Sequence, residues 1–421
     1  MNKWYKLDNA AKVFPSVTSK RRSNLFRLAF ILKEEIVPEV LEKALEYTIN
    51  RFPSMKVKIK KGLFWYYFEP NNEKPILYEE DPYICSKFNY KENKNYLFKV
   101  NYYYKRISIE VFHALTDGAG AMEFLKALVY NYLIMLGNKV DSENLILTDE
   151  IENIKEEHQD SFLKNYNLRY KHKTKEKKAL QWKGTLYQEN WLALVTGELS
   201  VSAIKEVAYR YDATITEFIG ACVIYSASKS LNLFENKHKP FQLFVPVDLR
   251  RLFPSKTLRN FSLFVRSTVD IEKQLTFEEV ISIVKGNIRE EVQKDKMLSR
   301  IVKNVSIEKN IFLRLVPLVI KEILLKVGYR IQGDKANSSS LSNLGKVNLP
   351  KDMRPYINRI EFCIGASYRA PVNLGIVSFE EKLVISFASA IVERDMIREF
   401  FRLISSFGIE VLIETNELEV F

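Results

Sequence analysis

The most constraining feature of the sequence is a strand that passes directly into a helix through six residues, HALTDG at 113–118. The preceding segment, 106–112, alternates apolar residues at Ile107, Ile109 and Val111, which predicts a strand with one buried face. After the turn, apolar side chains recur at helical spacing up to Leu136, and Gly137 is placed to cap the helix. A strand, a tight turn and a helix in this order predict an α/β fold.

The same alternation of strands and helices appears on both sides of a charged segment. Residues 138–185 are rich in Lys, Glu, Asp and Asn and lack apolar periodicity, which predicts a surface crossover with one short helix. Strands are expected at 24–32, 55–60, 63–68, 95–103, 192–200, 241–247, 261–269, 338–343, 357–364, 371–378 and 382–389. Helices are expected at 37–51, 201–211, 215–231, 276–297, 308–328 and from 393. We therefore predict two domains of similar make-up, 1–150 and 186–421, joined by a linker at 151–185.

Composition excludes several other classes of protein. With 47% hydrophobic residues in 421, the chain can bury large cores, so it is not an intrinsically disordered protein. The net charge of +12 favours phosphate-bearing ligands, but the cations stand among acids and no nucleic-acid-binding motif occurs. No nucleic-acid partner is expected.

The cysteines and the apolar segments bear on metal binding and on location. Cys85, Cys222 and Cys363 lie far apart and form no CxxC or Cys/His cluster, so we expect buried, reduced thiols and no metal site. The N-terminus has no signal-peptide core. The most apolar stretch, 311–327, is interrupted by Arg314, Lys321 and Glu322, which predicts a buried amphipathic helix instead of a membrane span. A cytoplasmic monomer is expected.

Among the four histidines, His113 is the candidate for chemistry. His158, His172 and His238 lie in charged, loop-like surroundings that are typical of solvated side chains. His113 ends a buried strand, where its imidazole can face a cleft and accept a proton near neutral pH. A single strand-end histidine is nevertheless more often structural than catalytic.

The residues that follow His113 also have ordinary interpretations. Asp117 by itself would be a helix N-cap, and Gly118 a turn residue. The combination HxxxDG at a strand-to-helix junction is much more specific than any of these residues alone.

The segment VFHALTDGAGAMEFLKALVYNYL resembles the active-site motif of the acyltransferase superfamily that includes chloramphenicol acetyltransferase. Plant acyl-CoA transferases, wax ester synthases, polyketide-associated acyltransferases and nonribosomal peptide condensation domains share this motif, and the segment is most similar to the alcohol acetyltransferase-like branch. Three more segments resemble other parts of the family, in the same order along the chain: RFPSMKVKI (51–59), VPVDLRRLFPSKTLRNFSLF (245–264) and SSLSNLGKVNLP (339–350). Phe112 stands where many relatives carry the first of two tandem histidines, and the plant-type DFGWG segment is absent.

The resemblance implies a fold and a mechanism. It implies two similar chloramphenicol-acetyltransferase-like domains, each a mixed sheet with helices, and an active-site tunnel between them. His113 would act as general base on an alcohol or amine that attacks the thioester directly. Asp117 would pair with a basic side chain, Arg250 or Lys56, and together with Gly118 would support the catalytic loop.

Further positions follow from the same resemblance. Asn260 and one of Ser342 or Asn343 could donate hydrogen bonds to an oxyanion, although they could equally be ordinary turn and strand-edge residues. Arg251, Lys256 and Arg259 lie in the loop that relatives place near the tunnel, and could attract the phosphates of CoA, although solvated loop cations have the same appearance.

Three functions remain open at the level of sequence. The first is an acyltransferase that moves an acyl group from acyl-CoA, as a co-substrate, to a small alcohol or amine, without a further cofactor. The second is a condensation-like enzyme that takes its acyl group from a carrier protein. The third is a scaffold without catalytic activity that has kept the fold. The sequence names neither the acyl length nor the acceptor.

Overall fold

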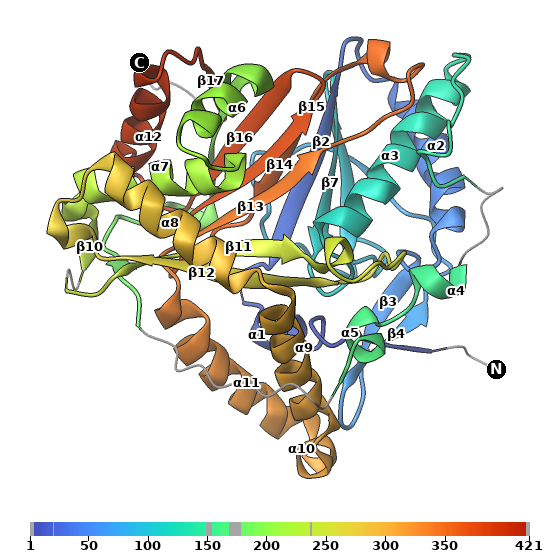
Figure 1. Cartoon of the computed structure of the whole chain (residues 1–421). Helices are drawn as coiled ribbons and strands as arrows, with labels where there is room; N and C mark the ends of the chain where they lie inside the picture. The colour runs from blue at the N-terminus through green and yellow to red at the C-terminus, as the bar shows by residue number, and fades with distance from the viewer. Residues whose placement is uncertain (1–3, 20, 149–153, 168–177, 236–237, 418–421) are drawn as a thin grey trace.

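The computed structural model describes residues 4–19, 21–148, 154–167, 178–235 and 238–417. Two mixed sheets form its centre and lie side by side, with helices on their outer faces (Figure 1). In the described residues the strand order of the smaller sheet is β14-β2-β7-β6-β5, and that of the larger sheet is β12-β11-β13-β15-β16-β9-β17. The predicted α/β architecture with two mixed sheets is confirmed.

The smaller sheet is built around the strand that carries the HALTDG turn. β7 (Arg106–Phe112) lies between β2 (Leu25–Leu32) and β6 (Phe98–Tyr103), and both neighbours run antiparallel to it. β5 (Leu77–Glu79) pairs with β6 in parallel. α2 (Pro38–Arg51) and α3 (Gly118–Met135) pack together on this side of the molecule, and α3 also contacts β2 and β7.

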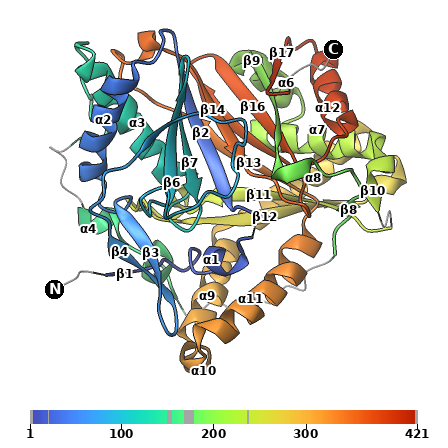
Figure 2. The ribbon, with the colours of Figure 1, turned by 180° about the vertical axis from the view of Figure 1, so that it is seen from behind.

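The larger sheet contains the later strands. They are β9 (Ala193–Ser200), β11 (Phe241–Asp248), β12 (Ser262–Val269), β13 (Ser339–Lys346), β15 (Val372–Phe379), β16 (Lys382–Ser389) and β17 (Leu412–Thr415). The helices that pack around it are α6 (Val201–Arg210), α7 (Ile215–Lys229), α8 (Phe277–Glu291) and α12 (Asp395–Ser406), as Figure 2 shows from behind. Thr214 and Thr276 begin α7 and α8 with capping boxes, in which threonine and glutamate bond each other's backbone N–H.

One strand from the later part of the chain belongs to the smaller sheet. β14 (Ile357–Ile364) pairs antiparallel with β2 and also contacts β15 and β16 of the larger sheet. Its position ties the two sheets together. The predicted domain boundaries stay a prediction.

The crossover carries more structure than the one short helix expected. In the described part of it, α4 (Ile154–Glu157) and α5 (Ser161–Lys164) form, and β8 (Gln181–Trp182) pairs with β10 (Phe234–Glu235). Glu157 forms a buried bidentate ion pair with Arg51, which anchors α4 to the end of α2.

The N-terminal part of the chain adds small elements that the sequence did not predict. β1 (Tyr5–Lys6) joins β3 (Val57–Lys61) and β4 (Tyr66–Pro70) in a separate sheet, and α1 (Phe14–Val17) packs against α11 (Leu318–Gln332).

The three cysteines are free and buried.

The helices expected at 276–297 and 308–328 are divided differently. After α8 the chain forms α9 (Lys294–Lys309), α10 (Ile311–Leu315) and α11, and Pro317 separates the last two. The prediction that 311–327 is a buried helix is wrong: most of its apolar side chains are exposed, because Lys321 and Glu322 face the protein. No helix among the described residues has the length and apolar character needed to cross a membrane.

Candidate active site

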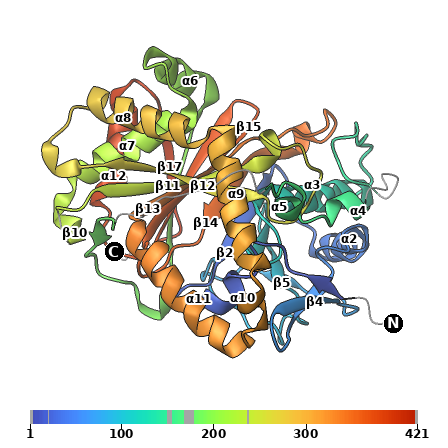
Figure 3. The same cartoon turned by 60° about the horizontal axis from the view of Figure 1, so that its bottom comes forward.

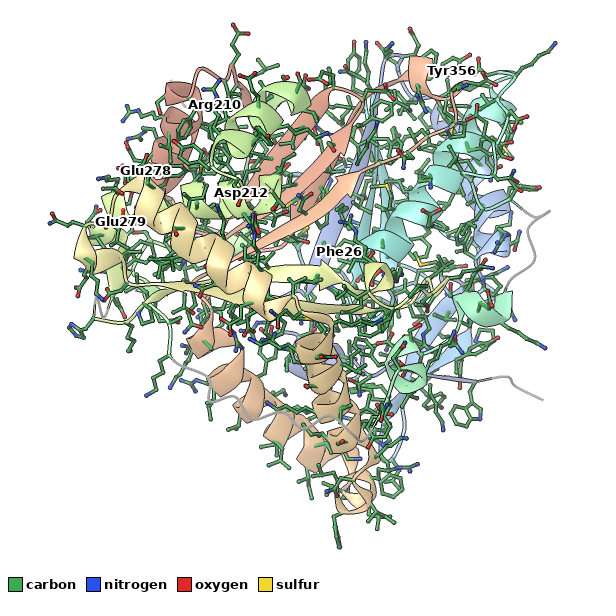
Figure 4. All side chains as sticks on the ribbon, in the orientation of Figure 1. Phe26, Arg210, Asp212, Glu278, Glu279 and Tyr356 are labelled. Carbon is green, nitrogen blue, oxygen red and sulfur yellow. The ribbon has the colours of Figure 1, made fainter. Side chains whose placement is uncertain are left out.

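His113 lies at the end of β7, where both sheets border a large cavity. Its backbone N–H donates to Asn24 O at 3.0 Å, which extends the pairing of β7 with β2 by one residue. The imidazole stacks on Phe14, with ring centroids 4.6 Å apart, and meets the edge of Phe26 at 5.2 Å. Phe26 lies near the centre of the molecule in Figure 4. Two aromatic rings and the strand end therefore hold the imidazole in a defined orientation.

A short chain of hydrogen bonds sets the tautomer of His113. Asn260 donates through Nδ2 to Asp8 Oδ2 at 3.2 Å, which turns Asn260 Oδ1 toward His113 Nδ1 at 2.9 Å. Because a carbonyl oxygen only accepts, Nδ1 of a neutral His113 carries the proton and Nε2 keeps the lone pair. Asp8 in turn accepts from Ala11 N at 2.8 Å and lies 3.7 Å from Arg259 Nε.

Burial changes the acid–base properties of this group. Desolvation lowers the pKa of His113 from its usual value, because the imidazolium form loses its hydration. The neutral form, which can take up a proton, is therefore favoured at neutral pH. Burial also raises the pKa of Asp8, although Arg259 opposes this shift.

Asp117 caps α3 and holds two loops together. It accepts from Gly120 N at 3.1 Å and from Phe261 N at 2.8 Å, and it receives Arg250 Nη1 at 2.9 Å and Nη2 at 3.1 Å. Arg250 also donates to the backbone oxygens of Thr257 and Arg259. Of the two cations considered as partners of Asp117, Arg250 is the one that contacts it.

The other cation lies elsewhere. Lys56 Nζ donates to Asn50 Oδ1 at 2.7 Å, on the exposed end of α2. The predicted basic partner is therefore Arg250, which reaches Asp117 across 133 residues of sequence.

Two glycines in the first turn of α3 are closely packed. A Cβ at Gly118 would lie 2.8 Å from the side chain of Leu344, and one at Gly120 only 2.2 Å from Leu258 O. The first neighbour can move, but the second is backbone, which Thr116 also bonds through its hydroxyl. The sequence pointed to Gly118, whereas Gly120 has the stricter requirement.

The cavity has a volume of about 1610 Å³ and is lined from both sheets. His113, Phe26 and Met122 line it from one side, and Phe244 and Ser342 from the other. This volume exceeds the roughly 300–1,000 Å³ of most small-molecule sites, so it can hold a donor and an acceptor together.

The predicted oxyanion residues differ in what they can still bind. Both ends of the Asn260 amide are engaged, and Asn343 donates to Thr216 Oγ1 and accepts from Gly345 N. Within the described residues Ser342 has no hydrogen-bonded side-chain partner, and it lines the cavity. Its hydroxyl therefore has no competing partner, whereas each asparagine already has a partner at both ends of its amide.

Only one of the three predicted CoA-binding cations borders the cavity. Arg251 lines it, and its guanidinium lies close to Gly345, the residue that precedes the lining residue Lys346. Lys256 is exposed and pairs with Glu156, and Arg259 is engaged by Asp8 and by the backbone of Lys6. Lys303, on α9, lines the cavity as well.

Sequence reasoning missed Asp8 and Phe14. Both precede the first predicted strand, and no motif connects them to His113, which lies 105 residues after Asp8 and 99 residues after Phe14. His158 stacks on Tyr5 and His238 is exposed, while His172 lies outside the described residues.

Comparison with known proteins identifies the fold. No protein-family model and no curated protein matches the chain by sequence. Among solved structures, TRI101 of F. graminearum, in complex with coenzyme A and deoxynivalenol, aligns with a TM-score of 0.63 and 12% identity over 97% of this chain and 99% of that one. TRI3 trichothecene 15-O-acetyltransferase of Fusarium sporotrichioides aligns with a TM-score of 0.58 and 11% identity, over 96% and 94%.

Condensation domains share the fold as well. The starter condensation domain of rhizomide synthetase, in complex with C8-CoA, aligns with a TM-score of 0.57 and 13% identity over 97% and 98% of the two chains. The chain therefore has the two-lobed fold of chloramphenicol-acetyltransferase-like enzymes and condensation domains. At these identities the likeness concerns the fold and does not select the alcohol acetyltransferase-like branch.

Proposed function

We propose that the protein is an acyltransferase that moves an acyl group from acyl-CoA to a small alcohol or amine, with His113 as general base. The observation that carries the proposal is the half-buried imidazole at the cavity wall, with Nδ1 held by Asn260 and Nε2 left as the base. The fold supports the same conclusion. TRI3, which shares it, is an O-acetyltransferase, and TRI101, which also shares it, was solved with coenzyme A bound.

In the proposed reaction, His113 Nε2 takes the proton from the hydroxyl or amine of the acceptor as it attacks the thioester carbon. The resulting tetrahedral oxyanion would be stabilised by the Ser342 hydroxyl. Collapse of this intermediate breaks the carbon–sulfur bond, and the imidazolium returns the proton to the departing thiolate. No covalent acyl-enzyme is needed, because a thioester already has a good leaving group.

Asp117 and Arg250 act in this scheme as positioning residues. Their ion pair joins the start of α3 to the loop that carries Asn260, which contacts His113. The paired amide of Asn260 favours a positioning role for this residue over the oxyanion role expected from sequence.

Binding of CoA tests the donor. Arg251, Lys303 and Lys346 would attract its phosphates to the cavity, so calorimetry should detect binding that weakens as salt rises. Arg251→Gln should weaken binding, whereas Lys256→Gln, in the same loop but outside the cavity wall, should not. Activity with an acylated carrier protein, together with no binding of CoA or any acyl-CoA, would favour the condensation-like class.

We expect Asp8→Ala to reduce kcat/KM roughly tenfold, the kinetic equivalent of one hydrogen bond. Without Asp8, the Asn260 amide can rotate, and His113 is no longer held in the tautomer that leaves Nε2 free. The measurements are the steady-state rate and the ¹⁵N shifts of the His113 ring, which report the tautomer without substrate.

Asp160→Ala is the matched control, because Asp160 anchors the same N-terminal segment through Asn9 N but does not contact Asn260. It should leave the tautomer unchanged. Equal effects of both substitutions on the ring shifts would show that Asp8 has only a general structural role.

The pH dependence follows from the pKa of His113. Burial lowers it below 6.5, and the base acts in its neutral form, so kcat/KM should fall only as pH drops through this lower value. We expect a plateau above about pH 6.5. The measurement is kcat/KM against pH with the free enzyme, and an acidic limb centred above pH 6.5 would contradict the assignment.

A further inference from the structure

Helices α9, α10 and α11 form a projection with an unusually apolar outer surface. Figure 3 shows α9 and α11 converging on α10, and side chains project outward from this end in Figure 4. We call this surface the apolar tip. It comprises exposed residues of the β3–β4 turn, α10 and α11: Leu63, Phe64, Ile311, Phe312, Leu313, Leu315, Val319, Ile320, Ile323, Leu324, Val327 and Ile331.

The succession of exposed apolar side chains along α10 and α11 sets this surface apart from ordinary scattered hydrophobic residues. Phe312 is 80% exposed, Ile311 and Leu315 are each 65% exposed, and Ile323 is 59% exposed. Isolated apolar side chains on a surface need no explanation, but a contiguous patch of this kind marks an interaction site.

Two charged residues of α11 face the protein, whereas most of its apolar residues face outward, which is the reverse of an ordinary surface helix. Lys321 is only 5% exposed, and its Nζ donates to Phe64 O and Arg314 O above the ring of Trp65. Glu322 bonds Tyr66 and Lys61. A surface helix normally exposes its charges and buries its apolar stripe, so the outward face of α11 is suited to an apolar medium.

The charges that remain exposed around the tip have one sign. Residues 309–331 contain a single acid, Glu322, which is occupied by the contacts just described. The exposed charged side chains of this segment are all cationic: Lys309, Arg314, Lys326 and Arg330. An apolar face bordered by Lys and Arg is complementary to a bilayer with anionic headgroups.

We propose that the apolar tip docks the protein on an anionic lipid bilayer, with the apolar side chains in the headgroup–acyl boundary and the cations at the phosphates. The helices are peripheral in this arrangement and do not span the membrane. Leu324 and Leu325 of α11 also line the cavity, so docking brings that wall of the cavity to the lipid surface.

The experiment is co-sedimentation of the full chain with vesicles. We expect binding to vesicles of phosphatidylcholine with phosphatidylglycerol, and weaker binding to phosphatidylcholine alone or at high salt. The triple variant Phe312→Gln, Ile323→Gln, Val327→Gln should reduce binding at least roughly tenfold, since it removes three inserted apolar side chains. None of the three lines the cavity, so the melting temperature and catalysis with water-soluble substrates should stay unchanged.

The matched control is Tyr209→Gln, Leu412→Gln, Ile413→Gln, which replaces three comparably exposed residues on α6 and β17. It should bind vesicles like the wild type. A second variant, Arg314→Glu, Lys326→Glu, Arg330→Glu, should abolish the preference for anionic vesicles.

Three results would overturn the proposal. One is a wild-type protein that binds neither kind of vesicle. Another is equal loss of binding in the tip variant and the control. The third is a dimer in light scattering without lipid that the tip variant converts to monomer, because the tip would then be an interface between two copies. Binding is measured without substrate, so its failure is independent of the proposed acyl transfer.

Discussion

His113→Ala is expected to lower the rate of acyl transfer about 10²–10⁴-fold, the usual cost of removing a general base. The reason is that no other described histidine lines the cavity, so no second imidazole can take the proton from the acceptor. The fold should survive, because the strand-end hydrogen bond to Asn24 is made by the backbone of residue 113. The measurement is single-turnover thiol release from acyl-CoA, with circular dichroism to verify folding.

His238→Ala provides the matched control, since His238 is exposed and lies away from the cavity. It should keep the wild-type rate. If His113→Ala retained near-normal turnover with the native substrates, the general base would have to be another group, and the proposed mechanism would fail.

Asp117→Ala should have the largest effect on stability, about 3–5 kcal/mol. The side chains of Asp117 and Arg250 are only 6% and 15% exposed, and removal of the carboxylate leaves the guanidinium partly buried without this partner. The backbone N–H groups of Gly120 and Phe261 lose their acceptor at the same time. Thermal and urea unfolding measure the loss. In the double variant with Arg250→Met, the loss of unfolding free energy should be smaller than the sum of the losses in the two single variants.

Glu206→Ala is the control for this prediction, because the Glu206–Arg210 pair is mostly exposed on α6. It should leave the melting temperature nearly unchanged. An unaltered melting temperature for Asp117→Ala would refute the structural role of the ion pair. A lowered rate at a temperature where Asp117→Ala is fully folded would support its effect on the position of His113.

The local elements could be predicted because their causes lie within a few residues of each other. The alternation at Ile107, Ile109 and Val111 specifies one buried face of β7, and the Asp117 side chain caps the helix that follows. The motif at 113–118 therefore indicated both the candidate base and its turn. The fold class followed from the same patterns, since regular spacing of apolar residues records which face of each element is buried.

Contacts between distant residues were decided by the tertiary structure. Asp8 and Asn260 are 252 residues apart, and neither has a local pattern that links it to His113. The choice of Arg250 over Lys56 required the loop after β11 to meet the start of α3. Helical spacing predicted a helix over 308–328, which includes most of α11, but not which face α11 exposes. The exposed face depends on Lys321, whose Nζ donates to the backbone oxygens of Phe64 and Arg314. The Phe64 oxygen is within reach only after the β3–β4 turn has packed against the helix.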